Sequence, residues 1–230
     1  MAAIYLIRHG QASFGAADYD RLSETGTLQS RVLGAALAPA LRRGCVIVCG
    51  SMQRHRQTAE ACLDAMGRAR EWQTDAAWNE LDHEAVIRAY RPEYADHSRL
   101  RADLTSAADP HHAFQTLFND AVARWASGAH DADYVESWTG FRARCQHALD
   151  TMLARLPAST DALVFTSGGP IASIVQTLMR TPEGDGFKLS WVLANAGITK
   201  LIISANGVVL STLNGHAHFE GEHAKLITYR

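Results

Sequence analysis

The stretch Ala3-Ile4-Tyr5-Leu6-Ile7-Arg8-His9-Gly10-Gln11 joins a short apolar run to a polar turn that contains glycine. The same arrangement recurs where Cys45-Val46-Ile47-Val48-Cys49 precedes Gly50-Ser51, and where Ala162-Leu163-Val164-Phe165-Thr166 precedes Ser167-Gly168-Gly169. Continuous apolar runs of this length, bounded by turn residues, are typical of strands that are buried on both faces by helices. The sequence therefore predicts an α/β fold in three layers, with a mostly parallel central sheet and helices on both faces.

The rest of the chain completes this fold. Residues 198–204 and 208–213 are separated by Ala205-Asn206-Gly207, whose Asn-Gly pair predicts an antiparallel hairpin at the sheet edge. Helical patterns run from a cap at Ser23 to about Arg42, from about Met52 to Met66, and from about Trp138 to Leu156. Residues 84–135 are polar and read as a helical insertion. Because no Gly/Ser/Pro linker delimits it, we expect residues 1–230 to form a single α/β domain.

Composition excludes several classes of protein. The chain has 22 Lys and Arg against 24 Asp and Glu, without a long basic run, which argues against a nucleic-acid partner and against a polybasic membrane anchor. We find no apolar run long enough for a membrane span and no basic segment typical of a signal peptide. The four cysteines lack C-x-x-C spacing and read as buried thiols. These features predict a cytoplasmic protein without a membrane partner.

The three polar turns should form one site, because ligands of open α/β sheets bind beyond the carboxyl ends of the strands. The turns supply Arg8, His9 and Gln11, then Ser51 and Arg54, then Ser167, with backbone N–H donors near glycines. A site with two guanidiniums, an imidazole and several N–H groups is suited to binding an oxyanion. Phosphate fits best because the arginine fork matches its oxygens. The lysine-containing phosphate loop of nucleotide triphosphatases is missing.

At these residues the sequence resembles a known family. Arg8-His9-Gly10-Gln11, Leu22-Ser23-Glu24-Thr25-Gly26-Thr27-Leu28-Gln29 and Ser51-Met52-Gln53-Arg54-His55-Arg56-Gln57-Thr58-Ala59 follow one another as in the histidine phosphatase superfamily, also called the phosphoglycerate mutase-like family. The match is good over about the first 60 residues, and looser at Glu80, at Ser167-Gly168-Gly169-Pro170-Ile171 and at Asn195-Ala196-Gly197-Ile198. The resemblance implies a phosphoglycerate mutase-like fold.

The resemblance also implies roles for individual residues. His9 would be the nucleophile that forms a phosphohistidine, and Arg8 and Arg54 would neutralise the phosphate charge. Glu80 would be the general acid, with Asp82 as the second choice. The remaining substrate-binding candidates are Gln11, Ser23, Ser167 and Gly168. This chemistry requires neither a metal nor a cofactor.

Two positions depart from the family pattern. The family usually has a second histidine in a His-Gly-Gly turn, where this chain has Ser167; a neutral hydroxyl in its place would weaken phosphate binding by about 1–2 kcal/mol unless another group compensates. His216 and His83 are the candidate substitutes. Gly15 stands where many members have Asn. We interpret His55 and Arg56 as solvent-facing residues of a helix.

These observations lead to a metal-independent cytosolic phosphatase that hydrolyses a small phosphomonoester through His9. The alternatives are a phosphoglycerate mutase that uses the same intermediate, and a phospho-ligand binding module that has lost turnover. A metal-dependent hydrolase built on His216 and His218 is less favoured, because metal ligands normally come from several elements. The natural substrate and the oligomeric state, including a homodimer, are left open by the sequence.

Overall fold

The computed structural model describes residues 2–13, 20–41, 44–181 and 186–229. The chain divides into two compact units. The first contains Met1–Glu80 and Cys145–Arg230, and the second contains Leu81–Arg144. The predicted helical insertion at about 84–135 lies within the second unit.

The first unit is built around a mixed sheet of six strands in the order β3-β2-β4-β1-β5-β6. The strands are β1 (Ala2–Arg8), β2 (Cys45–Cys49), β3 (Gln73–Thr74), β4 (Asp161–Thr166), β5 (Ile198–Ser204) and β6 (Gly207–Gly215). The first four strands are parallel, whereas β5 runs antiparallel to β1 and β6 antiparallel to β5. The predicted α/β fold with an antiparallel edge is confirmed; β3 is a short addition that no sequence pattern indicated.

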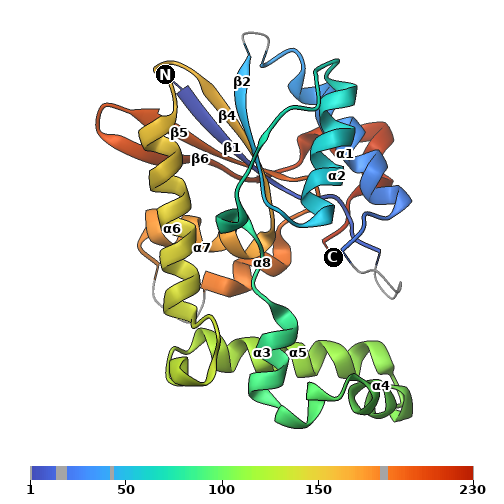
Figure 1. Ribbon diagram of the computed structural model, residues 1–230. Coiled ribbons are helices and arrows are strands. Elements are labelled where there is room, and N and C mark those ends of the chain that lie inside the picture. Colours follow the sequence, from blue (N-terminus) through green and yellow to red (C-terminus); the bar gives the residue numbers. More distant parts are fainter. Residues whose placement is uncertain (1, 14–19, 42–43, 182–185, 230) are drawn as a thin grey trace. The chain divides into compact units, whose positions relative to one another are not determined.

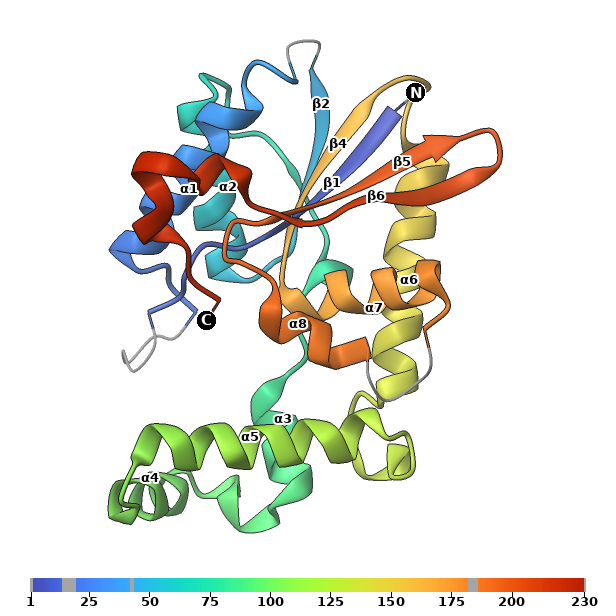
Figure 2. The same cartoon turned by 180° about the vertical axis from the view of Figure 1, so that it is seen from behind.

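Helices cover both faces of this sheet (Figures 1 and 2). One face carries α1 (Glu24–Leu37) and α2 (Gln53–Ala65), and the other carries α6 (Trp138–Arg155) and α7 (Gly168–Met179). Short helical turns complete the unit: η1 (Ala76–Trp78), η4 (Gly186–Lys188), α8 (Leu189–Val192), η5 (Ala217–Phe219) and η6 (Gly221–Leu226). A buried cluster joins Ile7 and Phe165 of the sheet to Leu33 of α1 and Cys62 of α2.

The register of the parallel strands aligns the ends from which the polar turns emerge. Arg8 at the end of β1 is opposite Thr166 at the end of β4, and Cys49 at the end of β2 is opposite Phe165. Successive turns therefore leave the sheet at one edge, as the sequence predicted.

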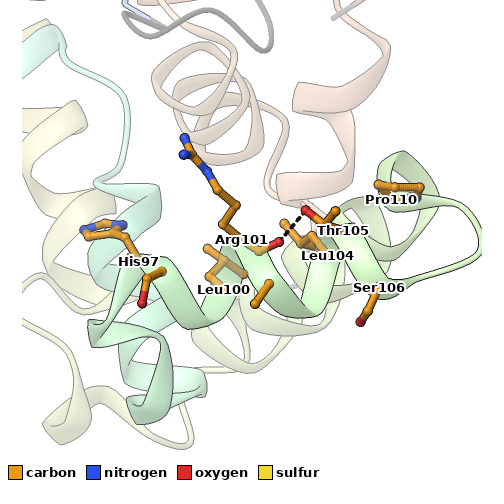
Figure 3. Close-up of a pocket in the computed structure, with 9 residues that line it drawn as sticks. His97, Leu100, Arg101, Leu104, Thr105, Ser106 and Pro110 are labelled. Atoms are coloured by element: carbon orange, nitrogen blue, oxygen red, sulfur yellow. Dashed lines mark hydrogen bonds between the residues drawn. The ribbon is translucent and has the colours of Figure 1, made fainter.

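The second unit is helical. It contains α3 (His83–Tyr90), η2 (Pro92–Ala95), α4 (His97–Ser106), α5 (Pro110–Ala126), η3 (Asp131–Asp133) and the start of α6. Asp82, Asp96 and Asp109 each cap the following helix by accepting a backbone N–H bond. A hollow beside α4 is lined by residues 97–110 alone and contains none of the candidate site residues (Figure 3).

The described cysteines are all free thiols. Cys49, Cys62 and Cys145 are buried, and Cys45 is half-buried. Burial raises the pKa of Cys49 and of Cys62 to about 12, so neither forms a thiolate near neutral pH. None of the helices in the described ranges is long and apolar enough to cross a membrane.

The turn after β1 depends on two glycines that bring backbone against backbone. A Cβ on Gly26, in the first turn of α1, would lie 2.2 Å from the carbonyl oxygen of Gln11, and a Cβ on Gly10 would lie 2.4 Å from the carbonyl oxygen of Gly26. Backbone atoms cannot move aside as a flexible side chain can. The close packing of this turn on α1 therefore requires glycine at both positions.

Replacing Gly26 with alanine should destabilise the protein by about 1–3 kcal/mol, although alanine is the better helix former. Denaturant unfolding followed by circular dichroism measures the change. Gly140→Ala in α6 is the matched control, because its nearest contact would be Ser137 Oγ at 3.3 Å; it should be neutral or stabilising. Equal effects of the two substitutions would contradict the close approach at Gly26.

Candidate functional site

The backbone of His9 is fixed by neighbours on both sides of β1. Its N–H donates to Thr166 O at 2.9 Å, which extends the pairing of β1 with β4 by one residue. Its carbonyl oxygen accepts from the backbone N–H of Ala196 and from Nδ2 of Asn195, each at 3.2 Å. The imidazole therefore starts from a rigid position at the carboxyl edge of the sheet.

The His9 ring is held in the form that a nucleophile requires. Nδ1 lies 2.7 Å from the carbonyl oxygen of Gly10, and because a carbonyl only accepts, Nδ1 carries the proton and Nε2 carries the lone pair. Burial, reinforced by the charges of Arg54 and Arg8, holds the pKa of His9 well below its usual range. The imidazole is neutral at physiological pH.

Arg54 lies in the first turn of α2 and is 4% exposed. Its Nη1 donates to Oδ1 of Asp20 at 2.6 Å, while Oδ2 of Asp20 accepts the backbone N–H of Gln53 at 2.7 Å. Asp20 thus orients the guanidinium from the start of the helix. Sequence reasoning missed Asp20, since it lies in a loop that matched no motif.

Arg8 is the last residue of β1 and contributes its charge to the site. Its Nη1 donates to the backbone carbonyls of Leu193 and Tyr229, the latter at 2.8 Å. The guanidinium is close enough to lower the pKa of His9. The sequence predicts that Arg8 binds the phosphate; in the structure, one nitrogen of its guanidinium donates to the loop before β5 and to the C-terminal segment.

Gln11 and Ser23 belong to one hydrogen-bonded group below the first turn. Ser23 Oγ donates to Gln11 Oε1 at 2.9 Å and accepts the N–H of Gly26 at 3.0 Å, which confirms Ser23 as the cap of α1. The backbone N–H of Gln11 donates to Oε1 of the buried Gln29 at 2.8 Å. This group holds the turn that carries His9 against α1.

Glu80 is brought to the third turn. Its Oε2 accepts the backbone N–H of Gly169 at 3.0 Å, in the first turn of α7. Thr166 Oγ1 donates to the carbonyl of Trp78 at 2.6 Å and ties the segment before Glu80 to the end of β4. The alternative acid, Asp82, accepts the N–H of Ala85 and caps α3 in the second unit.

The expectation that His55 faces solvent is wrong, whereas Arg56 is exposed as expected. The His55 side chain is wholly buried, and its Nε2 lies 2.6 Å from Ser167 Oγ. The rings of His55 and His9 have their centroids 5.8 Å apart. Burial, with a smaller effect from the charge of Arg54, holds the pKa of His55 well below its usual range.

The other histidines considered for the place of the missing one have different surroundings. His216 directs Nδ1 to the carbonyl of Asn214 at 2.6 Å, and His83 is the first residue of α3 in the second unit. Gly15 lies outside the described residues. Among the residues that are described, no group of three or more His, Cys, Asp or Glu side chains is placed to hold a metal ion. The described residues therefore offer no set of ligands for a metal-dependent hydrolase based on His216 and His218.

The comparisons with solved structures show the same fold. Mycobacterial glucosyl-3-phosphoglycerate phosphatase is 20% identical, with a TM-score of 0.61 over 94% of this chain and 100% of the other. A mutant phosphoserine phosphatase from Entamoeba histolytica is 19% identical, with a TM-score of 0.64 over 95% and 99% of the two chains. Phosphoglycerate mutase from Bacillus anthracis is 16% identical, with a TM-score of 0.62 over 94% of each chain.

A search of curated proteins by sequence gave no match. The sequence model that describes the histidine phosphatase superfamily (branch 1), in contrast, matches residues 4–216 of this chain. This range contains the candidate catalytic and substrate-binding residues, from Arg8 at the end of β1 to Gly168 at the start of α7. The chain belongs to the histidine phosphatase superfamily.

Proposed function

We propose that this protein is a metal-independent phosphomonoesterase in which His9 is transiently phosphorylated. The observation that carries the proposal is the state of the His9 ring: buried, neutral, and with Nδ1 bound to Gly10 O so that Nε2 keeps its lone pair. Membership of the superfamily supports phosphatase or mutase activity. Water as the final acceptor is part of our proposal.

In the first step, the Nε2 lone pair of His9 attacks phosphorus and the ester P–O bond breaks. The leaving oxygen takes a proton from the Glu80 carboxylic acid, so that the product alcohol departs neutral. Arg54, and Arg8 through its charge, offset the negative charge of the phosphoryl oxygens. Losing one such preorganised donor typically costs about 10²–10³ in rate.

In the second step, water attacks the phosphohistidine. The Glu80 carboxylate takes a proton from this water, the P–N bond breaks, and its electron pair returns to Nε2. Inorganic phosphate leaves, and Glu80 is again an acid. The contact of Glu80 with the N–H of Gly169 keeps the carboxyl group at the third turn throughout.

Replacing His9 with alanine should abolish both hydrolysis of para-nitrophenyl phosphate and acid-labile labelling by radiolabelled acetyl phosphate, because no other group would carry the phosphoryl. Steady-state turnover and a quenched labelling assay measure the two effects. His147→Ala is the control, since His147 is an exposed residue of α6, and it should leave both unchanged.

Hydrolysis that persists in His9→Ala would refute the assignment. A wild-type protein that binds phosphate without taking the label would instead be a binding module. Isomerisation of 3-phosphoglycerate in the presence of 2,3-bisphosphoglycerate, if faster than hydrolysis, would establish the mutase alternative.

Replacing Glu80 with glutamine should slow the first step, phosphoenzyme formation, by a factor that grows with the basicity of the leaving group, because a nitrophenolate can leave without a proton whereas an alkoxide needs one. The expected loss is small for para-nitrophenyl phosphate and about 10²–10⁴-fold for an alkyl phosphate. A series of substrates of rising leaving-group pKa measures this dependence. Asp82→Asn should not alter it, and a reversed result would make Asp82 the acid.

The depressed pKa of His9 can be observed directly. In an NMR titration its ring protons should not shift as the pH falls through about 6.5, where a histidine in a short peptide titrates. Since the unfolded chain takes up that proton and the folded protein does not, stability should fall below about pH 6.5, by about 1.4 kcal/mol per pH unit for each such histidine. Titration of His9 together with the peptide would contradict the neutral, buried nucleophile.

A further inference from the structure

His55 lies within the site although no motif assigned it a role. It follows Arg54 in the first turn of α2, its side chain is wholly buried, and its ring is a neighbour of the His9 ring. Its Nε2 lies 2.6 Å from Oγ of Ser167, the residue that follows β4. An imidazole and a hydroxyl from two separate elements therefore meet beside the nucleophile.

The backbone makes room for this ring. A Cβ on Gly50, the residue that follows β2, would lie 2.2 Å from His55 Nδ1, so no larger residue fits at position 50 without displacing the imidazole. The N–H of Gly50 nevertheless donates to Phe165 O at 3.0 Å, which keeps β2 paired with β4 up to this point. The ring is thus fixed between the ends of these two strands.

The direction of the hydrogen bond follows from the other ring nitrogen. Nδ1 of His55 is buried and has no hydrogen-bond partner among the described residues. A buried N–H without an acceptor is rarer and more costly than a buried lone pair without a donor. In the neutral ring the proton therefore belongs on Nε2, which donates to Ser167 Oγ and leaves the serine hydroxyl hydrogen for another acceptor.

The side chain of Ser167 does not cap the helix that it precedes, although serine at this position usually does so. It is the N-cap residue of α7, yet its side chain makes no capping hydrogen bond. The N–H of Gly169, which is two residues into the helix start, donates instead to Glu80 Oε2. The hydroxyl is consequently oriented by His55 rather than by the helix.

We propose that His55 is a positioning residue that directs the hydroxyl hydrogen of Ser167 onto an oxygen of the phosphoryl group transferred to His9. No proton is transferred between these groups: the Nε2–H of His55 donates to Oγ of Ser167, and the Oγ–H donates to the phosphoryl oxygen. The pair supplies a neutral donor at the position where the family usually has its second histidine. This inference rests on the proposed function of His9.

The test compares the rate of phosphoenzyme formation, read from the burst of nitrophenolate, in Ser167→Ala, His55→Ala and the double variant. Each single substitution should slow the burst by about 10²-fold, and the double variant should be no slower than either, because the two residues act as one unit. Circular dichroism confirms that each variant is folded. Arg56→Ala, the exposed neighbour on α2, should behave as wild type.

A second pair of variants separates positioning from simple packing. His55→Gln retains an N–H donor that can reach Ser167, whereas His55→Leu fills the space without one. Recovery of the burst rate in the glutamine variant alone supports positioning. Equal rates for glutamine and leucine would show that His55 only fills the space, and would overturn the proposal.

The outcomes also separate this inference from the proposed function. Acid-labile label on wild type together with an undiminished burst in Ser167→Ala would overturn the inference and leave the phosphatase intact. An acid-stable phosphate on Ser167 would make the serine itself the nucleophile and overturn both. A wild-type protein that takes no label would likewise remove both.

Discussion

The hydrogen bond from the N–H of His9 to the carbonyl of Thr166 is the constraint on which the site depends. It carries the parallel pairing of β1 and β4 one residue beyond the strands, so the residues that follow them, His9 and Ser167, leave the sheet side by side. The remaining groups are then added by elements that follow a strand: α2 brings Arg54 and His55, and the segment after η1 brings Glu80. This one backbone hydrogen bond thus fixes the relative positions of His9 and Ser167, which are distant in sequence.

The sequence was sufficient for the fold because its strong signals were physical requirements of a parallel sheet. Apolar runs such as Leu163 to Phe165 have no solvated face, and the rule that ligands gather at the carboxyl ends of strands then located the site. The boundaries were less precise: α1 ends at Leu37 rather than near Arg42. Nothing in the two residues of β3 distinguishes them from a loop, since they acquire their partners only through β2.

His55 was misplaced because its immediate neighbours, Arg54 and Arg56, suggested a solvated helix. The relevant spacing was longer. His55, Ala59 and Cys62 recur at intervals of four and three residues, which is the stripe that a helix buries, and all three are buried here. Arg54 and Asp20 illustrate a different limit: their pairing joins a helix to a loop 34 residues away, and no local pattern records such a contact.

Electrostatics explains why a neutral donor suits this crevice. His9 must remain uncharged to keep its lone pair, and it is surrounded by two guanidiniums that already oppose its protonation. A further buried cation beside it would add repulsion without improving the nucleophile. An imidazole that shares a hydrogen bond with a serine avoids this cost, since it can polarise and orient the hydroxyl while staying neutral. In the arrangement that we propose, His55 and Ser167 therefore act as one unit: a hydroxyl donates to the phosphoryl group, and the arginines supply the positive charge.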